Sequence, residues 1–217
     1  MNLPLLFRDE LNGFYRSKVM LVLWIGLPAL SMILYVAEPK TGIPAAVFTS
    51  LLVGSIGGTI ASAMLAISII SERERHVYDL FVIRPVRRRD ILLSKFFAVY
   101  LCVVMAGILA LGLGLLADYE FTGLAKGISY QNLESAMILL LSSLAISCSA
   151  GILIGVYSPS VLVGVILVLY GGNQASAVAI LPALIYESYY WFPLVPGVAV
   201  SALLLVGAIL IFNARQL

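Results

Sequence analysis

The chain has 217 residues, of which 62% are hydrophobic and 11% charged, and its formal net charge is +2. Soluble domains contain about 45–50% apolar and about 25% charged residues, so this composition excludes a soluble globular domain. The mean hydropathy of +1.07 indicates that lipid surrounds much of the chain. The small net charge says little about partners, and we expect no nucleic acid among them.

Residues 1–18 are predicted to form an amphipathic helix. Its apolar side chains recur at helical spacing on one face: Leu3, Phe7, Leu11 and Phe14. Polar side chains occupy the opposite face: Asp9, Asn12 and Arg16. The pattern favours a helix that lies in the interface of the lipid bilayer, although an ordinary cytosolic helix would show it too.

Six apolar runs follow, and each is predicted to cross the membrane as a helix, which takes about 20 apolar residues. They give spans 1 and 2 within 19–70, spans 3 and 4 within 96–156, and spans 5 and 6 within 161–213. No charge-rich block is long enough to fold separately. We therefore predict an all-α membrane protein with a single transmembrane domain over residues 1–217.

The predicted fifth span is interrupted by Gly171-Gly172-Asn173-Gln174. A helix broken at membrane depth has to be sheltered by protein or by a wet cavity. Aromatic residues and prolines gather after the break, as they do where a chain meets the headgroup layer. Residues 173–195 are therefore predicted to form an irregular segment on the outer side of the membrane.

The distribution of Lys and Arg residues predicts the orientation. With the N-terminus in the cytosol, all of them except Lys40 and Lys126 fall on cytosolic segments. The positive-inside rule then places both termini in the cytosol, and we expect a multi-pass protein of the cell (plasma) membrane.

Residues 71–95 form a long charged loop between spans 2 and 3. Ser71 and Glu74 have the spacing of a capping box, which predicts a short helix that Arg84-Pro85 would end. The run Arg87 to Asp90 is predicted to open the next helix, which continues straight into span 3. The basic run Arg87–Arg89 suits topology and anionic lipid, at about 1 kcal/mol for each residue. Anionic lipid would not attract the acidic residues of the loop. A helix that docks on a cytosolic partner explains why the loop contains both acidic and basic residues.

The loop resembles that of type-2 ATP-binding-cassette (ABC) exporter permeases. In that family an acidic residue at the end of span 2 is followed by a leucine-rich turn, a proline, a basic cluster and a lysine entering span 3. This chain has the same order: Glu72 or Glu74, then Leu80, Pro85, Arg87 to Arg89, and Lys95. It departs from the family at His76-Val77, where Gly-Thr is usual. The resemblance covers the whole chain as architecture and residues 71–95 as a motif.

The resemblance implies that a separate ABC ATPase subunit docks on this loop and that two permease chains pair, as a homodimer or a heterodimer. The residues expected to couple ATP hydrolysis to transport are Glu72, Glu74, Tyr78, Asp79, Leu80, Phe81, Arg84 and Arg87. A simple capping role is the alternative for the first two. ATP and Mg²⁺ would bind the partner, because this chain has no Gly-x-x-x-x-Gly-Lys-Ser/Thr loop, and we expect no cofactor and no catalytic residue in it.

A substrate path would have to be lined by weakly polar side chains, because no predicted span contains an ionisable residue. The candidates are Ser55, Thr59, Ser62, Asn173 and Gln174, of which the last two could instead cap the broken helix. Small residues also recur at every fourth position in two ridges: Gly54, Gly58, Ser62 and Ala66, and Ser143, Ser147, Gly151 and Gly155. We expect the ridges to pack within the chain rather than between two chains.

Other classes of protein fit the sequence less well. An intramembrane enzyme would need a nucleophile with a histidine, a zinc-binding histidine pair or paired aspartates, and His76 is the only histidine. The same lack of ligands argues against a metal site. Two alternatives stay open, an ATP-independent channel or secondary transporter and a membrane assembly scaffold. The nature of an exported cargo does not follow from the sequence.

Overall fold

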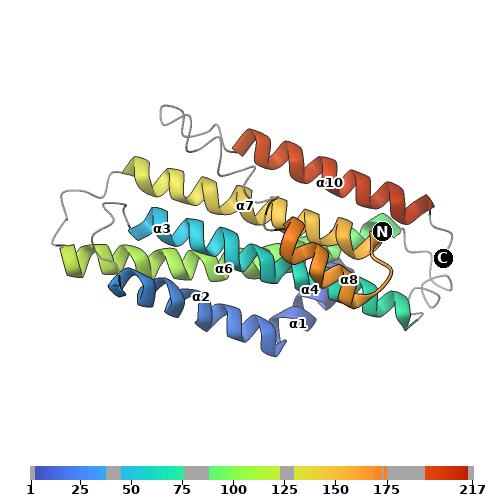
Figure 1. Ribbon diagram of the computed structural model, residues 1–217, viewed down its shortest axis with the longest axis horizontal. Helices are drawn as coiled ribbons and strands as arrows, with labels where there is room; N and C mark the ends of the chain where they lie inside the picture. The colour runs from blue at the N-terminus through green and yellow to red at the C-terminus, as the bar shows by residue number, and fades with distance from the viewer. Residues whose placement is uncertain are drawn as a thin grey trace.

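The computed structural model describes residues 3–37, 45–75, 88–122, 130–172, 174 and 194–214. Every element within these ranges is a helix, and the long helices run side by side in one bundle (Figure 1). The α-helices are α1 Leu3–Tyr15, α2 Lys18–Ala37, α3 Ala45–Leu52, α4 Gly58–Glu74, α6 Arg88–Thr122, α7 Tyr130–Tyr157, α8 Val161–Leu167 and α10 Leu194–Ala214. Two π-helical turns, η1 Val53–Gly57 and η2 Val168–Gly172, join α3 to α4 and extend α8.

Four helices in the described ranges are long and apolar enough to cross a membrane, or up to five if α1 and α2, which meet at a bend of 66°, form one span. The four are Phe48–Glu74, Arg89–Leu116, Leu133–Tyr157 and Leu194–Phe212. The predicted all-helical character is thereby confirmed for the described residues, and the long apolar helices support the prediction of a membrane-embedded protein. Six spans stay a prediction, because residues 175–193 lie outside the described part of the chain and the apolar helix Val161–Gly172 is too short to qualify.

Helix α7 lies at the centre of the bundle. It packs against α10 on one side and against α3 and α4 on the other (Figure 1). Helix α6 packs against α1, α2 and α3, and the short α8 rests on α4. The outward faces of α2, α8 and α10 carry exposed apolar side chains such as Ile25, Leu162 and Leu203, as expected for helices that face lipid.

The two ridges of small residues pack directly against each other, which brings α4 and η1 into close contact with α7. Four pairs face one another along the contact: Gly54 with Ser143, Gly58 with Ser147, Ser62 with Gly151, and Ala66 with Gly155. The closest approach to backbone atoms is at Gly151, where an added Cβ atom would lie 2.6 Å from both the Cα atom and the carbonyl oxygen of Ser62. Packing of these ridges within the chain, rather than between two chains, is therefore confirmed.

The hydroxyl groups buried in this contact bond mostly to their own helix. Ser143 Oγ donates to the carbonyl oxygen of Leu140 at 3.1 Å, and Ser147 Oγ donates to that of Ser143 at 2.9 Å. A hydroxyl that is satisfied in this way can be buried without an unpaired polar group. Serine in α7 is therefore small enough to permit close approach of α4, and burying its hydroxyl group leaves no hydrogen bond unmade.

Candidate functional site

Lys95 in α6 is charged, yet its side chain is only 1% exposed. Its ammonium nitrogen Nζ lies 2.8 Å from Glu10 Oε1 in α1 and 2.6 Å from Glu72 Oε1 in α4. Nζ also donates to Ser68 Oγ at 3.3 Å, and Ser68 Oγ donates to Glu72 Oε1 at 3.1 Å. We call Glu10, Ser68, Glu72 and Lys95 the charge cluster.

The charge cluster surrounds the ammonium group with partners. Its nitrogen donates hydrogen bonds to Ser68 and Glu72 and forms a second ion pair with Glu10. The ring of Phe14 lies on a further side, with its centroid 6.0 Å from Nζ. Lysine is almost never fully buried unless it is paired, so these partners are what allow Lys95 to sit inside the bundle.

The charge cluster exists because α4 and α6 extend beyond the predicted spans. Hydropathy predicts an end of span 2 at residue 70, but α4 continues to Glu74. It begins span 3 at residue 96, whereas the helix predicted to open at Arg87 to Asp90 and run into that span is present: α6 begins at Arg88 and places Lys95 about two turns inside the helix. Glu72 and Lys95 thus lie just beyond the predicted ends of spans 2 and 3, but inside continuous helices in which their opposite charges are paired.

Glu10 reaches Lys95 because α1 turns back at Ser17. The Ser17 hydroxyl accepts a hydrogen bond from the backbone N–H of Met20 at 3.1 Å, and the Ser17 carbonyl accepts one from Leu21. This is the N-cap arrangement, and it starts α2 in a new direction. The resulting bend of 66° lays α1 against α6 with Glu10 facing the bundle.

Part of the apolar face of α1 packs against protein. Leu11 and Phe14 are half-buried against the hydrophobic core, and the Tyr15 ring meets Trp24 of α2 edge-on at 5.5 Å. Leu5 on the other side of the helix is 64% exposed. The predicted amphipathic helix is present, and its side-chain contacts attach it to the bundle while its outer face stays open to surroundings such as lipid.

A second polar contact joins the last turn of α4 to the opposite side of the bundle. The guanidinium of Arg73 donates to the carbonyl oxygens of Val156, at 3.4 Å, and of Ser158. These carbonyls lie at the C-terminal end of α7 and in the turn before α8, where a helix leaves acceptors unpaired. Glu72 and Arg73 are neighbours in sequence, so one turn of α4 is held to α6 by the first, and through Lys95 to α1, and to α7 by the second.

Replacing Arg73 with alanine should lower the free energy of unfolding by about 1.5–3 kcal/mol, the usual range for hydrogen bonds to a charged group. Arg73→Lys should recover little of this stability, because a lysine ammonium is a point charge and does not reproduce the planar guanidinium that reaches two carbonyl oxygens. Thermal unfolding in detergent would measure the loss. Arg75→Ala is the matched control: Arg75 is exposed, and its loss should cost less than about 0.5 kcal/mol. Equal losses in both variants would contradict the capping role of Arg73.

No protein-family model and no curated protein matches the sequence. The function of the chain therefore has to be inferred from its residues and their geometry. Among the described residues no three His, Cys, Asp or Glu side chains come together as metal ligands. Cys102 and Cys148 are buried free thiols on different helices.

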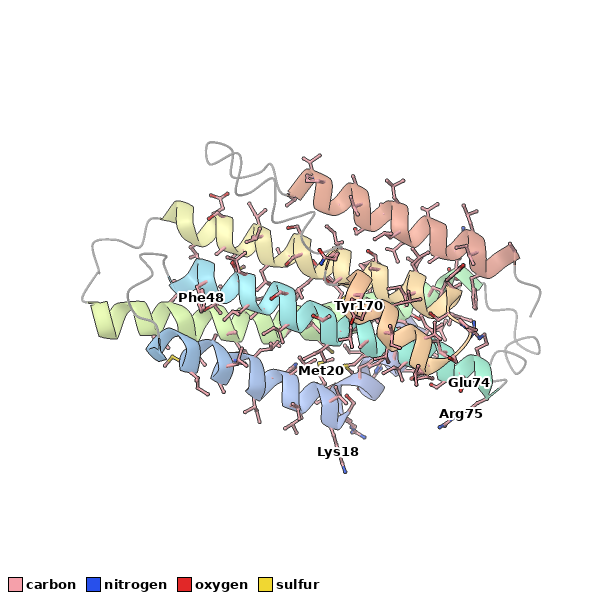
Figure 2. All side chains as sticks on the ribbon, in the orientation of Figure 1. Lys18, Met20, Phe48, Glu74, Arg75 and Tyr170 are labelled. Carbon is pink, nitrogen blue, oxygen red and sulfur yellow. The ribbon has the colours of Figure 1, made fainter. Side chains whose placement is uncertain are left out.

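Of the predicted coupling residues, the structure describes Glu72 and Glu74. Glu72 belongs to the charge cluster, and Glu74 is exposed at the end of α4, beside Arg75 (Figure 2). The capping box is wrong, because α4 runs through Ser71 without a break and the Ser71 hydroxyl donates to the carbonyl of Ser68 at 3.1 Å. The other predicted coupling residues lie outside the described part of the chain: Tyr78, Asp79, Leu80, Phe81, Arg84 and Arg87.

The predicted path residues are not all found together. Ser55 and Thr59 are half-buried and bond within their own helix, to the carbonyls of Leu52 and Ser55. Ser62 is fully buried in the contact with Gly151. Gln174 is exposed, and Asn173 lies outside the described residues. Their role in a path stays a prediction.

Sequence reasoning does not identify Glu10 as a partner of Lys95. It singles out Lys95 itself only as the last residue of the loop motif. A signal for Glu10 is present, because this residue follows Phe7 by three residues and precedes Phe14 by four, which places a carboxylate on the apolar face of α1. An ionisable group on an apolar face needs a buried partner of opposite charge. The sequence alone does not say which cation that partner is.

Proposed function

We propose that the chain is the transmembrane permease subunit of an ABC exporter, with six spans and with ATP hydrolysis on a separate subunit that docks on the loop after α4. One observation supports this most strongly. The last turn of α4 is joined to α6 by Glu72–Lys95, through Lys95 to Glu10 of α1, and to α7 by Arg73, in partly buried ionic and hydrogen bonds. A displacement of this loop would therefore move four helices together.

The arrangement suits a chain that is driven by a partner. The loop leaves α4 at Arg75 and returns into α6 at Arg88, and Glu72 and Lys95 clamp the two helices just inside these points. Such a clamp prevents the helices from separating locally when the loop is pushed. An ATP-independent channel or a scaffold has no comparable need for a loop rigidly tied to the bundle.

The remaining parts of the proposal follow from the resemblance to ABC-2 type permeases. Two permease chains pair, as a homodimer or a heterodimer, and form the substrate path between them or from the bilayer. ATP and Mg²⁺ bind the partner ATPase. Both termini are cytosolic, in the cell membrane, which agrees with the gathering of Arg73, Arg75, Arg89 and Lys95 where α4 ends and α6 begins.

The test is purification of the native complex in mild detergent, followed by an assay of ATPase activity. Recovery of an ATPase with a phosphate-binding loop, in equal stoichiometry with this chain, supports the exporter. Recovery of the chain alone across several detergents would overturn the proposal in favour of a channel or an assembly scaffold.

A prediction on the loop itself concerns Leu80 and Phe81, which lie outside the described residues. Replacing either with aspartate should uncouple ATP hydrolysis from transport, because a charge would enter an apolar contact with the ATPase. The ratio of ATP hydrolysed to substrate moved, measured in proteoliposomes, would rise several-fold while the bundle stays folded. A normal ratio of ATP hydrolysed to substrate moved in both variants would contradict the role of these residues in coupling.

A further inference from the structure

One ammonium group joins three helices of the bundle. Lys95 is part of α6, Glu72 of α4 and Glu10 of α1, and both carboxylates lie close to the same nitrogen, at 2.6 and 2.8 Å. The loop connects α4 and α6 directly, so the covalent chain already couples those two helices. Helix α1 is far from them in sequence, and its ionic contact with them is through Lys95.

The two carboxylates of the charge cluster are held differently. Glu72 is fixed by its own helix, because the Ser68 hydroxyl one turn earlier donates to the same oxygen at 3.1 Å. Glu10 is held by the ammonium of Lys95, from a different helix. Leu11 and Phe14 of α1 pack against the core through apolar contacts, which have little directional preference. The Glu10–Lys95 ion pair is therefore a link of specific charge between α1 and the rest of this end of the bundle.

We infer that Lys95 is the positioning residue that transmits a displacement of α4 and α6 to the N-terminal helix α1, with Glu72 as its fixed anchor and Glu10 as the partner that is moved. The inference rests on the proposed function for the source of the displacement. Because the Ser17 cap joins α1 to α2 at a fixed bend, α2 would follow α1. The substrate path would then receive the motion from two sides, through α4 directly and through α2 by way of Lys95.

A merely stabilising salt bridge would also explain the contacts, so the test separates the two roles by exchanging charges. The double variant E72K/K95E preserves an ion pair between α4 and α6 but sets a carboxylate at position 95 against Glu10, which disconnects α1 alone. The triple variant E10K/E72K/K95E restores opposite charges at both contacts and is the matched control. Glu10→Gln is a milder variant that leaves Glu72 and Lys95 untouched.

The first measurement is hydrogen–deuterium exchange of residues 3–15 in the purified chain in lipid nanodiscs. Exchange should become roughly a hundredfold faster in E72K/K95E, because breaking a buried pair frees α1, and about tenfold faster in Glu10→Gln. The triple variant should return to within about threefold of the original chain, and exchange of α4 and α6 should change little in any variant. Unchanged exchange of α1 in both the double variant and Glu10→Gln would overturn the inference.

The second measurement adds the co-purified ATPase with ATP and Mg²⁺. In the original chain and in the triple variant, ATP should change the exchange of residues 3–15, and in the double variant this response should be lost while ATP is still hydrolysed. An ATP response of α1 that persists in the double variant would overturn transmission through Lys95 and leave the proposed function standing. Failure to recover any ATPase would overturn the proposed function and, with it, ATP-driven transmission, while the first measurement still decides whether Lys95 holds α1.

Discussion

Replacing Lys95 with methionine should lower the free energy of unfolding by about 3–5 kcal/mol, the cost of removing one partner from a buried ion pair. Methionine keeps much of the side-chain volume, so the loss comes mainly from charge. Glu10 and Glu72 would face each other without the ammonium between them, and each is only about a quarter exposed, at 26% and 27%. A thiol-reactive dye in a thermal melt would measure the loss, because Cys102 and Cys148 are free and react only when unfolding exposes them.

Two further variants show whether charge is the cause. Lys18→Met removes a lysine that projects away from the bundle (Figure 2), and it should cost less than about 0.5 kcal/mol. Adding Glu10→Gln and Glu72→Gln to Lys95→Met should recover most of the lost stability, since no buried charge is then left unpaired. A triple variant as unstable as Lys95→Met alone would contradict the electrostatic explanation and point to packing around the lysine stem.

Replacing Gly151 with leucine should unfold the bundle or cost more than about 3 kcal/mol, the upper part of the range for overpacking. Even the first added carbon would lie 2.6 Å from backbone atoms of Ser62, and backbone cannot rotate away as a side chain can. Gly151→Ala should already separate α4 from α7 and lower the midpoint of thermal unfolding. The dye-based melt would record both variants.

The matched control is Gly112→Ala in α6, where an added Cβ atom would have nothing within 4 Å. Alanine loses less conformational entropy in a helix than glycine, so this variant should be neutral or stabilise by up to about 1 kcal/mol. The same chemical change is thus expected to have opposite signs at two positions. A comparable loss of stability at both would mean that helix α7 does not depend on close approach at Gly151.

The sequence predicted that the two small-residue ridges would be buried within the chain, and they are. Their spacing could show that each helix permits close approach, because only glycine, serine and alanine occupy every fourth position. It could not show which helix each would meet. The packing partner of each ridge depends on how all the helices of the bundle are arranged. It is therefore a property of the whole bundle and not of either segment.

The candidate site was predicted less completely. Hydropathy ended the second span at residue 70 and began the third at 96, because it treats Glu72 and Lys95 as polar residues that belong in water. In the folded chain each neutralises the other, and the helices continue past both boundaries. Glu10 completes the cluster from α1, and its position depends on the bend at Ser17, whose size no local pattern of residues specifies.

The contact between α4 and α7 has a consequence for how the bundle can move. All four facing pairs of the ridges have the same separation in sequence, so the two helices run parallel in a single register. Small shifts along the helix axis would drive serine side chains into backbone. The next matching register lies four residues away, a step of about 6 Å. These two helices should therefore move as one rigid unit, and any movement of α4 relative to the rest of the bundle should carry α7 with it and not slide one helix past the other.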